Sequence, residues 1–75
     1  MKRARGKPEK WEAEMLRERR LELGLSQHEV AEEAGIDLRH YQQFEYGVRR
    51  FSHCYFSIGL RICEVLELDP FEFVC

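Results

Sequence analysis

The residue types best able to do chemistry lie between positions 38 and 43 of this 75-residue chain. Arg39 can donate two hydrogen bonds to O6 and N7 of guanine, and Gln43 can pair with N6 and N7 of adenine. Leu38 can pack on the methyl group of thymine. Composition alone nevertheless favours a solvated polar helix face, so the elements that hold these residues must decide between the two interpretations.

The stretch SQHEVAEEAGID, residues 26–37, indicates how these side chains are positioned. Ser26 as N-cap and Glu29 three residues later form a capping box, and Gly35 ends the helix in the left-handed conformation. Asp37 is the expected N-cap of the next helix. Two hydrophobic staples are expected to fix the entry angles of these helices, Leu25 on Val30 and Ile36 on Tyr41. The sequence therefore predicts two short helices joined by a rigid turn.

Apolar periodicity predicts an all-α fold of five short helices, with no strand signal and no internal repeat. The expected helices cover about residues 10–23, the stretch between Ser26 and Gly35, about 38–46, about 57–66, and a short segment that begins at residues 69–72. Tyr41 and Phe44 are the expected core residues of the third helix. The fourth helix is expected to turn four apolar residues inward, Ile58, Ile62, Val65 and Leu66.

Length and composition are those of a small soluble globular protein, with 44% hydrophobic and 35% charged residues. One domain is expected over residues 10–75, and no apolar run approaches the ~18–20 residues of a membrane span, so we expect a cytoplasmic protein. The net charge of −2 hides a separation of charge, because residues 1–10 carry +4 and the other 65 residues carry −6. One pole of the protein is therefore suited to an anion and another is not.

Residues 1–9 are expected to form a flexible basic arm, since they include Gly6, Pro8 and a cluster of basic side chains. Arg3 and Arg5 of this arm are candidate DNA contacts. The alternative is a disordered tail that only keeps the protein soluble.

The three cysteines, Cys54, Cys63 and Cys75, show neither CxxC spacing nor a companion pair of histidines at zinc-ligand spacing. His40 and His53 do not complete a ligand set with Cys54, so we expect no metal site and no cofactor. Cys63 falls in an apolar helical pattern and is expected in the core. Cys75 is expected to be an unpaired thiol, the alternative being a cross-link between two copies of the chain.

Two short helices joined by a glycine-containing turn form a helix-turn-helix unit, whose second helix lies in the major groove of DNA. The stretch GLSQHEVAEEAGIDLRHYQQFEYG resembles the core of the Cro and phage-repressor family of DNA-binding domains. The positions that carry the resemblance at fixed spacing are Arg20, Gly24, Leu25, Ser26, Gln27, Val30, Ala31, Gly35, Ile36, Tyr41, Phe44, Glu45 and Gly47. It covers about residues 16–50 and, more loosely, 57–74, and it implies the lambda-repressor-like fold.

The resemblance implies roles for individual residues. Gln27 matches the glutamine that holds a backbone phosphate at a helix N-terminus, where free N–H groups attract anions. The alternative for Gln27 is an exposed residue without a partner. Leu38, Arg39 and Gln43 match the positions that face base edges. Two residues flank them, His40 and Gln42.

Three further residues, Tyr46, Arg49 and Arg50, follow the recognition helix, where the loop of the family grips phosphate. Alternatively, the two arginines only favour the helix C-terminal dipole. Arg20 and Glu45 match a partly buried ion pair that links the first helix to the end of the third. The resemblance implies that this pair is structural.

The segment VRRFSHCYFS departs from the family, because it makes the connector to the fourth helix about three residues longer. Tyr55 and Phe56 in this connector either cover the core or form a surface for a partner. Gly59 stands where the family prefers a hydrophobic residue.

The expected function is a sequence-specific double-stranded DNA-binding transcriptional regulator. A homodimer is expected, because one recognition helix reads few bases whereas a two-fold dimer reads two half-sites about 34–36 Å apart. The chain resembles stand-alone Cro-like repressors and the controller proteins of restriction–modification systems. Phe71, Phe73 and Val74 are the candidate dimer surface, unless they close the small core.

The rival function is a protein-interaction module, such as an antitoxin or adaptor, whose helix-turn-helix domain binds a protein partner. The acidic balance outside the arm favours it modestly. We do not expect an enzyme, because the sequence offers no Ser/His/Asp set, no P-loop and no metal-ligand cluster.

Overall fold

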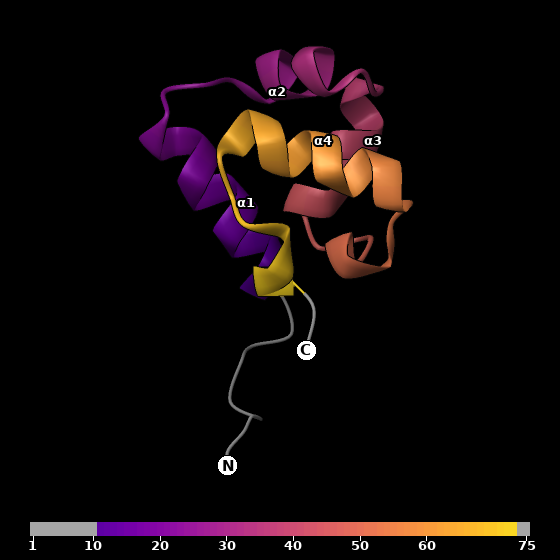
Figure 1. The fold of residues 1–75 in the computed structure, drawn as a ribbon. Coiled ribbons are helices and arrows are strands. Elements are labelled where there is room, and N and C mark those ends of the chain that lie inside the picture. Colours follow the sequence, from indigo (N-terminus) through magenta and orange to yellow (C-terminus); the bar gives the residue numbers. More distant parts are fainter. Residues whose placement is uncertain (1–10, 74–75) are drawn as a thin grey trace.

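The computed structural model describes residues 11–73, which form four α-helices and two short 3-10 helices (Figure 1). In chain order these are α1 (Trp11–Glu22), α2 (Gln27–Ala34), α3 (Leu38–Glu45), the 3-10 helix η1 (Phe51–His53), α4 (Phe56–Leu66) and the 3-10 helix η2 (Pro70–Phe73). No strand occurs within residues 11–73, and the all-α prediction is confirmed. The candidate residues Arg3, Arg5, Val74 and Cys75 lie outside the described residues.

The capping box at the start of α2 is present as predicted. Ser26 Oγ accepts a hydrogen bond from Glu29 N at 3.0 Å, and Glu29 Oε1 accepts one from Ser26 N at 2.8 Å. Gly35 ends α2 with φ +74°, a left-handed conformation that costs glycine little. The start and the end of α2 are therefore both fixed by local chemistry.

Asp37 is the N-cap of α3, as predicted, but its side chain makes no capping hydrogen bond. Its carbonyl oxygen instead accepts the first helical bond, from Tyr41 N at 3.1 Å. The apolar residues that precede the two helices, Leu25 and Ile36, pack against a core that includes Val30 and Tyr41. Apolar packing thus replaces the missing cap at this corner.

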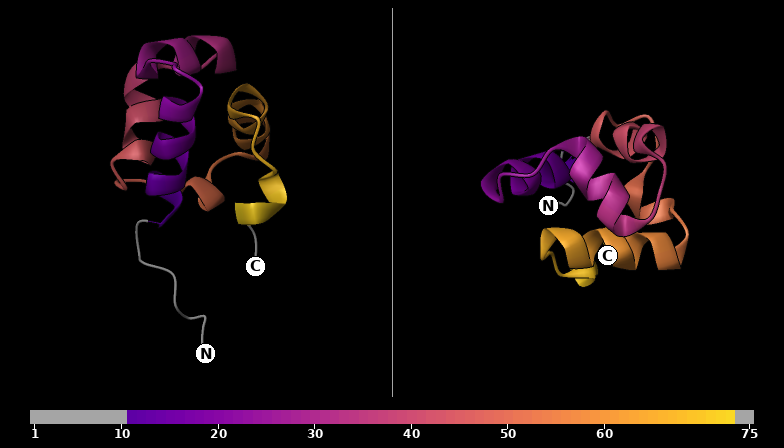
Figure 2. Two further views of the ribbon diagram at one scale, coloured as in Figure 1. Left: turned by 90° about the vertical axis from the view of Figure 1, so that its left-hand side faces the viewer. Right: turned by 90° about the horizontal axis from the view of Figure 1, so that it is seen from above.

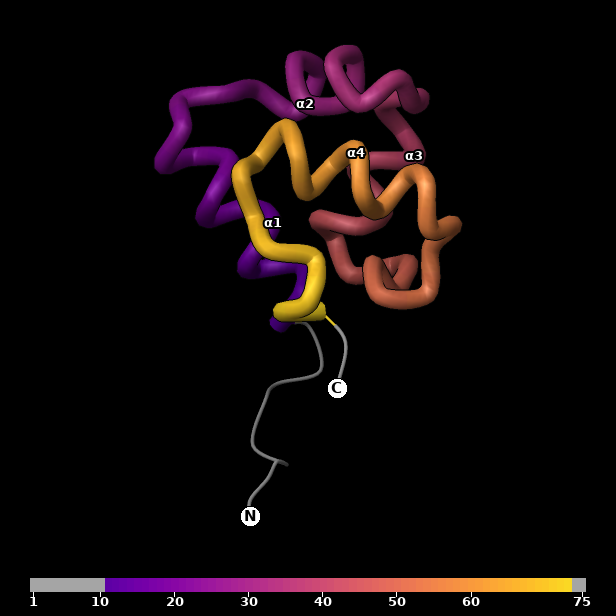
Figure 3. The backbone as a smooth tube through the Cα atoms, viewed as in Figure 1, coloured from indigo at the N-terminus to yellow at the C-terminus, as the bar shows by residue number. Residues whose placement is uncertain are grey.

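The helices enclose one small core, in which α2 crosses the ends of α1 and α3 while α4 packs against α2 (Figure 2). Six large side chains are fully buried, Leu16, Val30, Tyr41, Phe44, Ile62 and Leu66. Cys63 is buried and Ile58 and Val65 are partly buried, in agreement with the inward face predicted for α4. The backbone trace shows how short the connection between α2 and α3 is (Figure 3).

The connector between α3 and α4 contributes to the core, which apolar periodicity does not indicate. Phe51 on η1 is buried and makes edge contacts with Phe44, at a centroid distance of 5.5 Å, and with Phe73, at 4.7 Å. Trp11 stacks on Phe73 at 5.7 Å. We call these four rings the aromatic row; they link α1, α3, η1 and η2.

Tyr55 ends this connector and Phe56 begins α4; both are exposed, so they do not cover the core. Gly59 follows them on α4. A Cβ atom there would lie 3.2 Å from Cys54 Sγ, so the missing side chain lets the connector pack closely on the helix.

The chain after α4 turns tightly rather than forming a fifth α-helix. Asp69 Oδ1 accepts a hydrogen bond from Phe71 N at 3.0 Å, and η2 is only four residues long. Phe73 is buried, whereas Phe71 is exposed, so one of these two candidate dimer residues closes the core and the other does not. None of the helices within residues 11–73 is long and apolar enough to cross a membrane.

Candidate nucleic-acid interface

A groove of about 720 Å³ runs between α3 and the segment that follows it. Its lining includes polar and charged side chains from both sides, Asp37, Arg39, His40, Gln43, Arg49, Arg50, His53 and Tyr55. The structure therefore brings five of the predicted site residues together around one hollow. It adds His53 and Tyr55, which the sequence analysis did not assign to the site.

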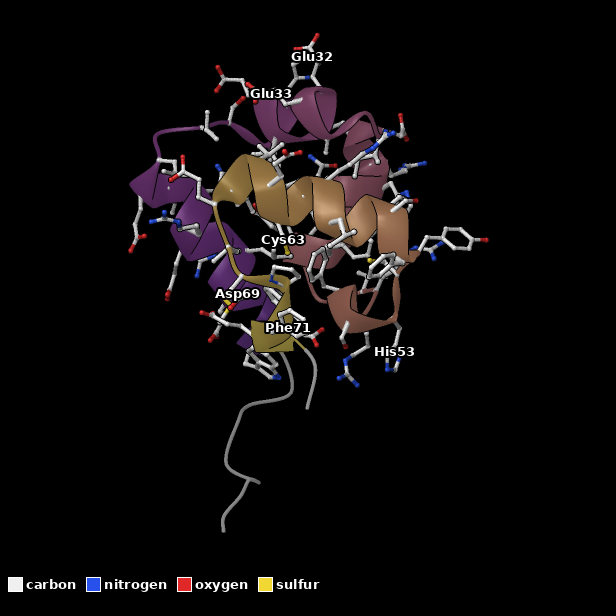
Figure 4. The ribbon with its side chains drawn as sticks, in the orientation of Figure 1. Glu32, Glu33, His53, Cys63, Asp69 and Phe71 are labelled. Atoms are coloured by element: carbon white, nitrogen blue, oxygen red, sulfur yellow. The ribbon has the colours of Figure 1, made fainter. Side chains whose placement is uncertain are left out.

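The charge of this groove is positive, since three arginines face one aspartate. The acidic residues that dominate elsewhere lie on other surfaces. Glu32 and Glu33 project from the outer side of α2, and Asp69 lies beside η2 (Figure 4). Within residues 11–73, the arginines of the groove and these three acidic side chains therefore lie on different surfaces.

The side chains of α3 differ in how freely they face solvent. Arg39 is exposed, and Gln42 and Gln43 are half-buried. Leu38 is partly buried and packs against the core, so only part of it is open to a ligand. The ring of His40 lies 5.1 Å from that of Phe44, which holds it against the helix.

Gln27, at the N-terminus of α2, is hydrogen-bonded to two residues of α3. Its Nε2 donates to Glu45 Oε1 at 3.0 Å, and its Oε1 accepts from Gln42 Nε2 at 3.1 Å. The orientation of the Gln27 amide is therefore set from both ends. An exposed Gln27 without a partner, the alternative considered from the sequence, is not what the structure has.

Glu45 is the centre of the polar network that ties α1, α2 and α3 together. Its carboxylate accepts hydrogen bonds from Arg20 Nε at 2.6 Å, Arg20 Nη2 at 3.2 Å and Tyr41 OH at 2.5 Å. The side chain of Glu45 is 0% exposed and that of Arg20 is 11% exposed. Arg20 Nη1 also donates to the carbonyl oxygen of Leu25 at 2.9 Å, which fixes the approach to α2.

The network changes the acidity of its members. Burial acts to raise the pKa of Glu45, but hydrogen bonds from its three partners outweigh burial and hold the pKa below the ordinary value of 4.5. Burial and the hydrogen bond to Glu45 raise the pKa of Tyr41. The hydrogen bond to Glu45 raises the pKa of Arg20. Glu45 is therefore a carboxylate and Tyr41 a neutral phenol at pH 7.

Arg49 is bound to the end of α3. Its Nε donates to Gln43 Oε1, while the carbonyl oxygen of Gln43 accepts hydrogen bonds from Val48 N at 2.9 Å and Arg49 N at 3.1 Å. Gly47, with φ +77°, makes the turn that brings the chain back. Tyr46 ends α3 and is exposed.

Arg50 lies beside α1 as well as the groove. Its Nε is 3.5 Å from Glu12 Oε1, and the Glu12 side chain is only 6% exposed while that of Arg50 is 56% exposed. Glu12 also accepts from Ser52 N at 3.4 Å. Glu12 was not among the residues predicted from the sequence, although its i, i+4 spacing from the buried Leu16 places both on one helix face.

The two cysteines within the described range, Cys54 and Cys63, form no disulfide bond. Both thiols are free, and burial raises the pKa of Cys63 to about 11, so it stays protonated. Within residues 11–73 no group of three or more His, Cys, Asp or Glu side chains is arranged to hold a metal ion.

Comparison with known proteins identifies the segment that contains most of this interface. Residues 16–52, from within α1 to η1, match a family model described as Helix-turn-helix. No curated protein matches the chain, and no solved structure matches it.

Proposed function

Residues 16–52 form a helix-turn-helix domain of the Cro and phage-repressor type, a DNA-binding family, and from this premise we propose that the chain is a sequence-specific transcriptional regulator that binds double-stranded DNA as a homodimer. Its recognition helix is α3. One observation carries the proposal: the exposed face of α3 forms one wall of a cationic groove, and a capped and packed corner holds that helix in place.

The base contacts are assigned to the exposed face of α3. Arg39 is exposed and is suited to O6 and N7 of guanine, the commonest specific arginine contact in the major groove. Gln43 is the second base-reading residue. The exposed part of the Leu38 side chain can pack on a thymine methyl group. His40 and Gln42 flank these positions.

The phosphate contacts are assigned to the ends of α2 and α3. The amide nitrogen of Gln27 carries two N–H groups, and the bond to Glu45 occupies one of them. The other can donate to a phosphate beside the free N–H groups at the start of α2. Tyr46, Arg49 and Arg50 supply the phosphate contacts after α3, and Arg3 and Arg5 supply them from the arm.

The homodimer contact is assigned to an apolar surface on α4 and η2. Phe56 is 80% and Phe71 78% exposed, and Leu60 lines a groove with Leu68 and Pro70, beside Arg61 and Glu64. We define the five apolar residues, Phe56, Leu60, Leu68, Pro70 and Phe71, as the α4–η2 surface. A second copy is the occupant that DNA reading requires, because two recognition helices are needed to read two half-sites about 34–36 Å apart.

The test is a gel-shift titration against duplexes selected from a random pool, at several salt concentrations. If a dimer neutralises roughly eight phosphates, the logarithm of affinity falls against the logarithm of salt concentration with a slope of about −7. Binding that is absent, or insensitive to salt, would contradict the proposal.

A protein-interaction module is the second candidate function, and the exposed α4–η2 surface is the observation that favours it. The same titration separates the two candidates. An adaptor or antitoxin that acts only through a protein partner gives no salt-sensitive shift with any duplex.

A further inference from the structure

The hydrogen bond between Arg49 and Gln43 restricts what Gln43 can recognise. Arg49 Nε donates to Gln43 Oε1, and both side chains line the groove beside α3. A guanidinium group has only donors, so the atom of the Gln43 amide that faces it must be the carbonyl oxygen. The amide nitrogen, with its two N–H groups, is then the part of Gln43 left for a ligand.

The backbone holds this pair together, so the contact does not depend on side-chain rotamers alone. Val48 N and Arg49 N both donate to the carbonyl oxygen of Gln43. Gly47 adopts φ +77° in the turn between them, a conformation that side chains other than that of glycine rarely adopt. The start of the Arg49 side chain is therefore fixed near Gln43 before either side chain meets DNA.

We propose that Arg49 is a specificity-determining residue that acts through Gln43: it holds the amide oxygen on its own side and leaves the amide nitrogen for the base, so that Gln43 reads guanine rather than adenine. The proposal rests on the proposed DNA-binding function. A free glutamine pairs with adenine by accepting from N6 and donating to N7, which needs its oxygen. The oxygen has a second lone pair, but while it is turned toward Arg49 the amide nitrogen is the atom left to face the base, and adenine N6 then has no acceptor opposite it.

The four bases then rank by the acceptors that they present in the major groove. Guanine offers two, N7 and O6, and thymine offers one, O4. Adenine offers N7 but places a donor beside it, and cytosine offers only a donor. Guanine is therefore the base that offers the Gln43 amide nitrogen the most acceptors.

The experiment selects duplexes from a random pool with the full chain and three variants. Gln43→Met identifies the base position that residue 43 reads, because it removes the amide and relaxes selection at that position. Arg49→Ala frees Gln43 Oε1 and is expected to change the preferred base there from guanine to adenine, by roughly 10-fold in relative affinity. Arg49→Lys keeps the charge and one possible donor to Oε1, and is expected to retain the preference for guanine.

Arg50→Ala is the matched control, since it removes a neighbouring arginine that contacts Glu12 rather than Gln43. It is expected to weaken all sequences alike and to leave the preferred base unchanged. Circular dichroism establishes that each variant is folded.

Two results would overturn the inference while the proposed function stands. One is wild-type selection of adenine at the position that Gln43→Met relaxes. The other is an Arg49→Ala variant that selects the same base as the wild type. A wild-type chain that binds no duplex would instead remove the proposed function, and this inference with it.

Discussion

Gln27 Nε2 lies 3.0 Å from Glu45 Oε1, so the first residue of α2 is hydrogen-bonded to the last residue of α3. This bond closes the helix-turn-helix corner on its polar side, while Leu25 and Ile36 hold it on the apolar side. Because Arg20 on α1 donates to the same carboxylate, three helices meet at one side chain. The orientation of α3 therefore depends on Glu45.

Replacement Glu45→Gln should destabilise the fold by roughly 3–5 kcal/mol, because it leaves Arg20 buried without its counter-charge. Urea denaturation followed by circular dichroism measures the loss. The matched control is Glu22→Gln, which makes the same chemical change in an exposed ion pair with Arg19 and should cost less than about 1 kcal/mol. Equal effects of the two changes would contradict the central role of Glu45.

Tyr41→Phe tests the same network more gently, in case Glu45→Gln does not fold. It removes the hydrogen bond from the phenol to a charged carboxylate and keeps the buried ring. The expected loss is about 1.5–3 kcal/mol in the same denaturation experiment. A loss near zero would show that the phenol contributes nothing to holding the carboxylate.

The free energy of unfolding should fall in acid because of Glu45. Its pKa in the folded chain lies below its ordinary value of 4.5, so the carboxylate stabilises the fold above about pH 4.5. That contribution is lost as the pH falls from this value through the lower, folded pKa. Urea denaturation between pH 7 and pH 3 should therefore give a steeper decline for the wild type than for Glu45→Gln. Parallel curves would disprove the assignment.

Gly35→Ala and Gly24→Ala should destabilise the fold by similar amounts. Both glycines have a left-handed φ, +74° and +72°, so each replacement carries the same backbone cost of about 1–2 kcal/mol. A Cβ atom at Gly35 would lie 3.0 Å from Arg61 Nη1, but this is the end of an exposed and flexible side chain that can move away, and a Cβ atom at Gly24 meets no atom within 4 Å. The midpoints of thermal unfolding should therefore fall equally, and a clearly larger fall for Gly35→Ala would contradict this account.

Arg39→Ala should cost about 1–3 kcal/mol of DNA-binding free energy at one base position and relax selection there. Gln27→Ala, by contrast, should weaken all sequences about equally, because phosphate contacts carry no sequence information. Titration of the selected duplex and of its single-base variants measures both effects. An Arg39→Ala variant with unchanged base preference would refute the assignment of α3 as the reading helix.

Phe71→Asp should shift the chain from dimer to monomer, because a charge on the α4–η2 surface opposes burial against a second copy. Val48→Asp is the control, since Val48 is equally exposed but lies outside that surface. Sedimentation equilibrium gives the dissociation constants. A wild-type chain that stays monomeric at high concentration, or a Phe71→Asp variant that dimerises unchanged, would contradict the proposed interface.

Local signals in the sequence were sufficient for the helical framework. The capping box of Ser26 and Glu29 and the stop at Gly35 need only neighbouring residues, and the structure has both. Asp37 is the N-cap of α3 as predicted, but packing of Ile36 and the backbone bond from Tyr41 define that end without a hydrogen bond from its side chain. Residue type alone does not show which interaction, a side-chain hydrogen bond or apolar packing, fixes the boundary of a helix.

Contacts between segments that are distant in the chain could not be predicted from the sequence. Phe51 stands in a polar connector without apolar periodicity, and its contacts with the distant Phe44 and Phe73 make it a core residue. Likewise, the pairing of Arg50 with Glu12 joins residues 38 positions apart. The groove lining by His53 and Tyr55 depends on where that connector lies once it is anchored.

The aromatic row determines which fragment of this chain can be used in a fusion protein. The segment recognisable by its family ends at residue 52, yet Trp11 and Phe73, outside it, stack together and cover Phe51, which in turn supports Phe44 of α3. A fragment of residues 16–52 would lack Trp11 and Phe73, and Phe51 would lose its contact with Phe73. The segment that folds on its own is thus longer than residues 16–52, which match the family model. A chimaeric protein that is to keep the function of this domain must also include Trp11 and Phe73.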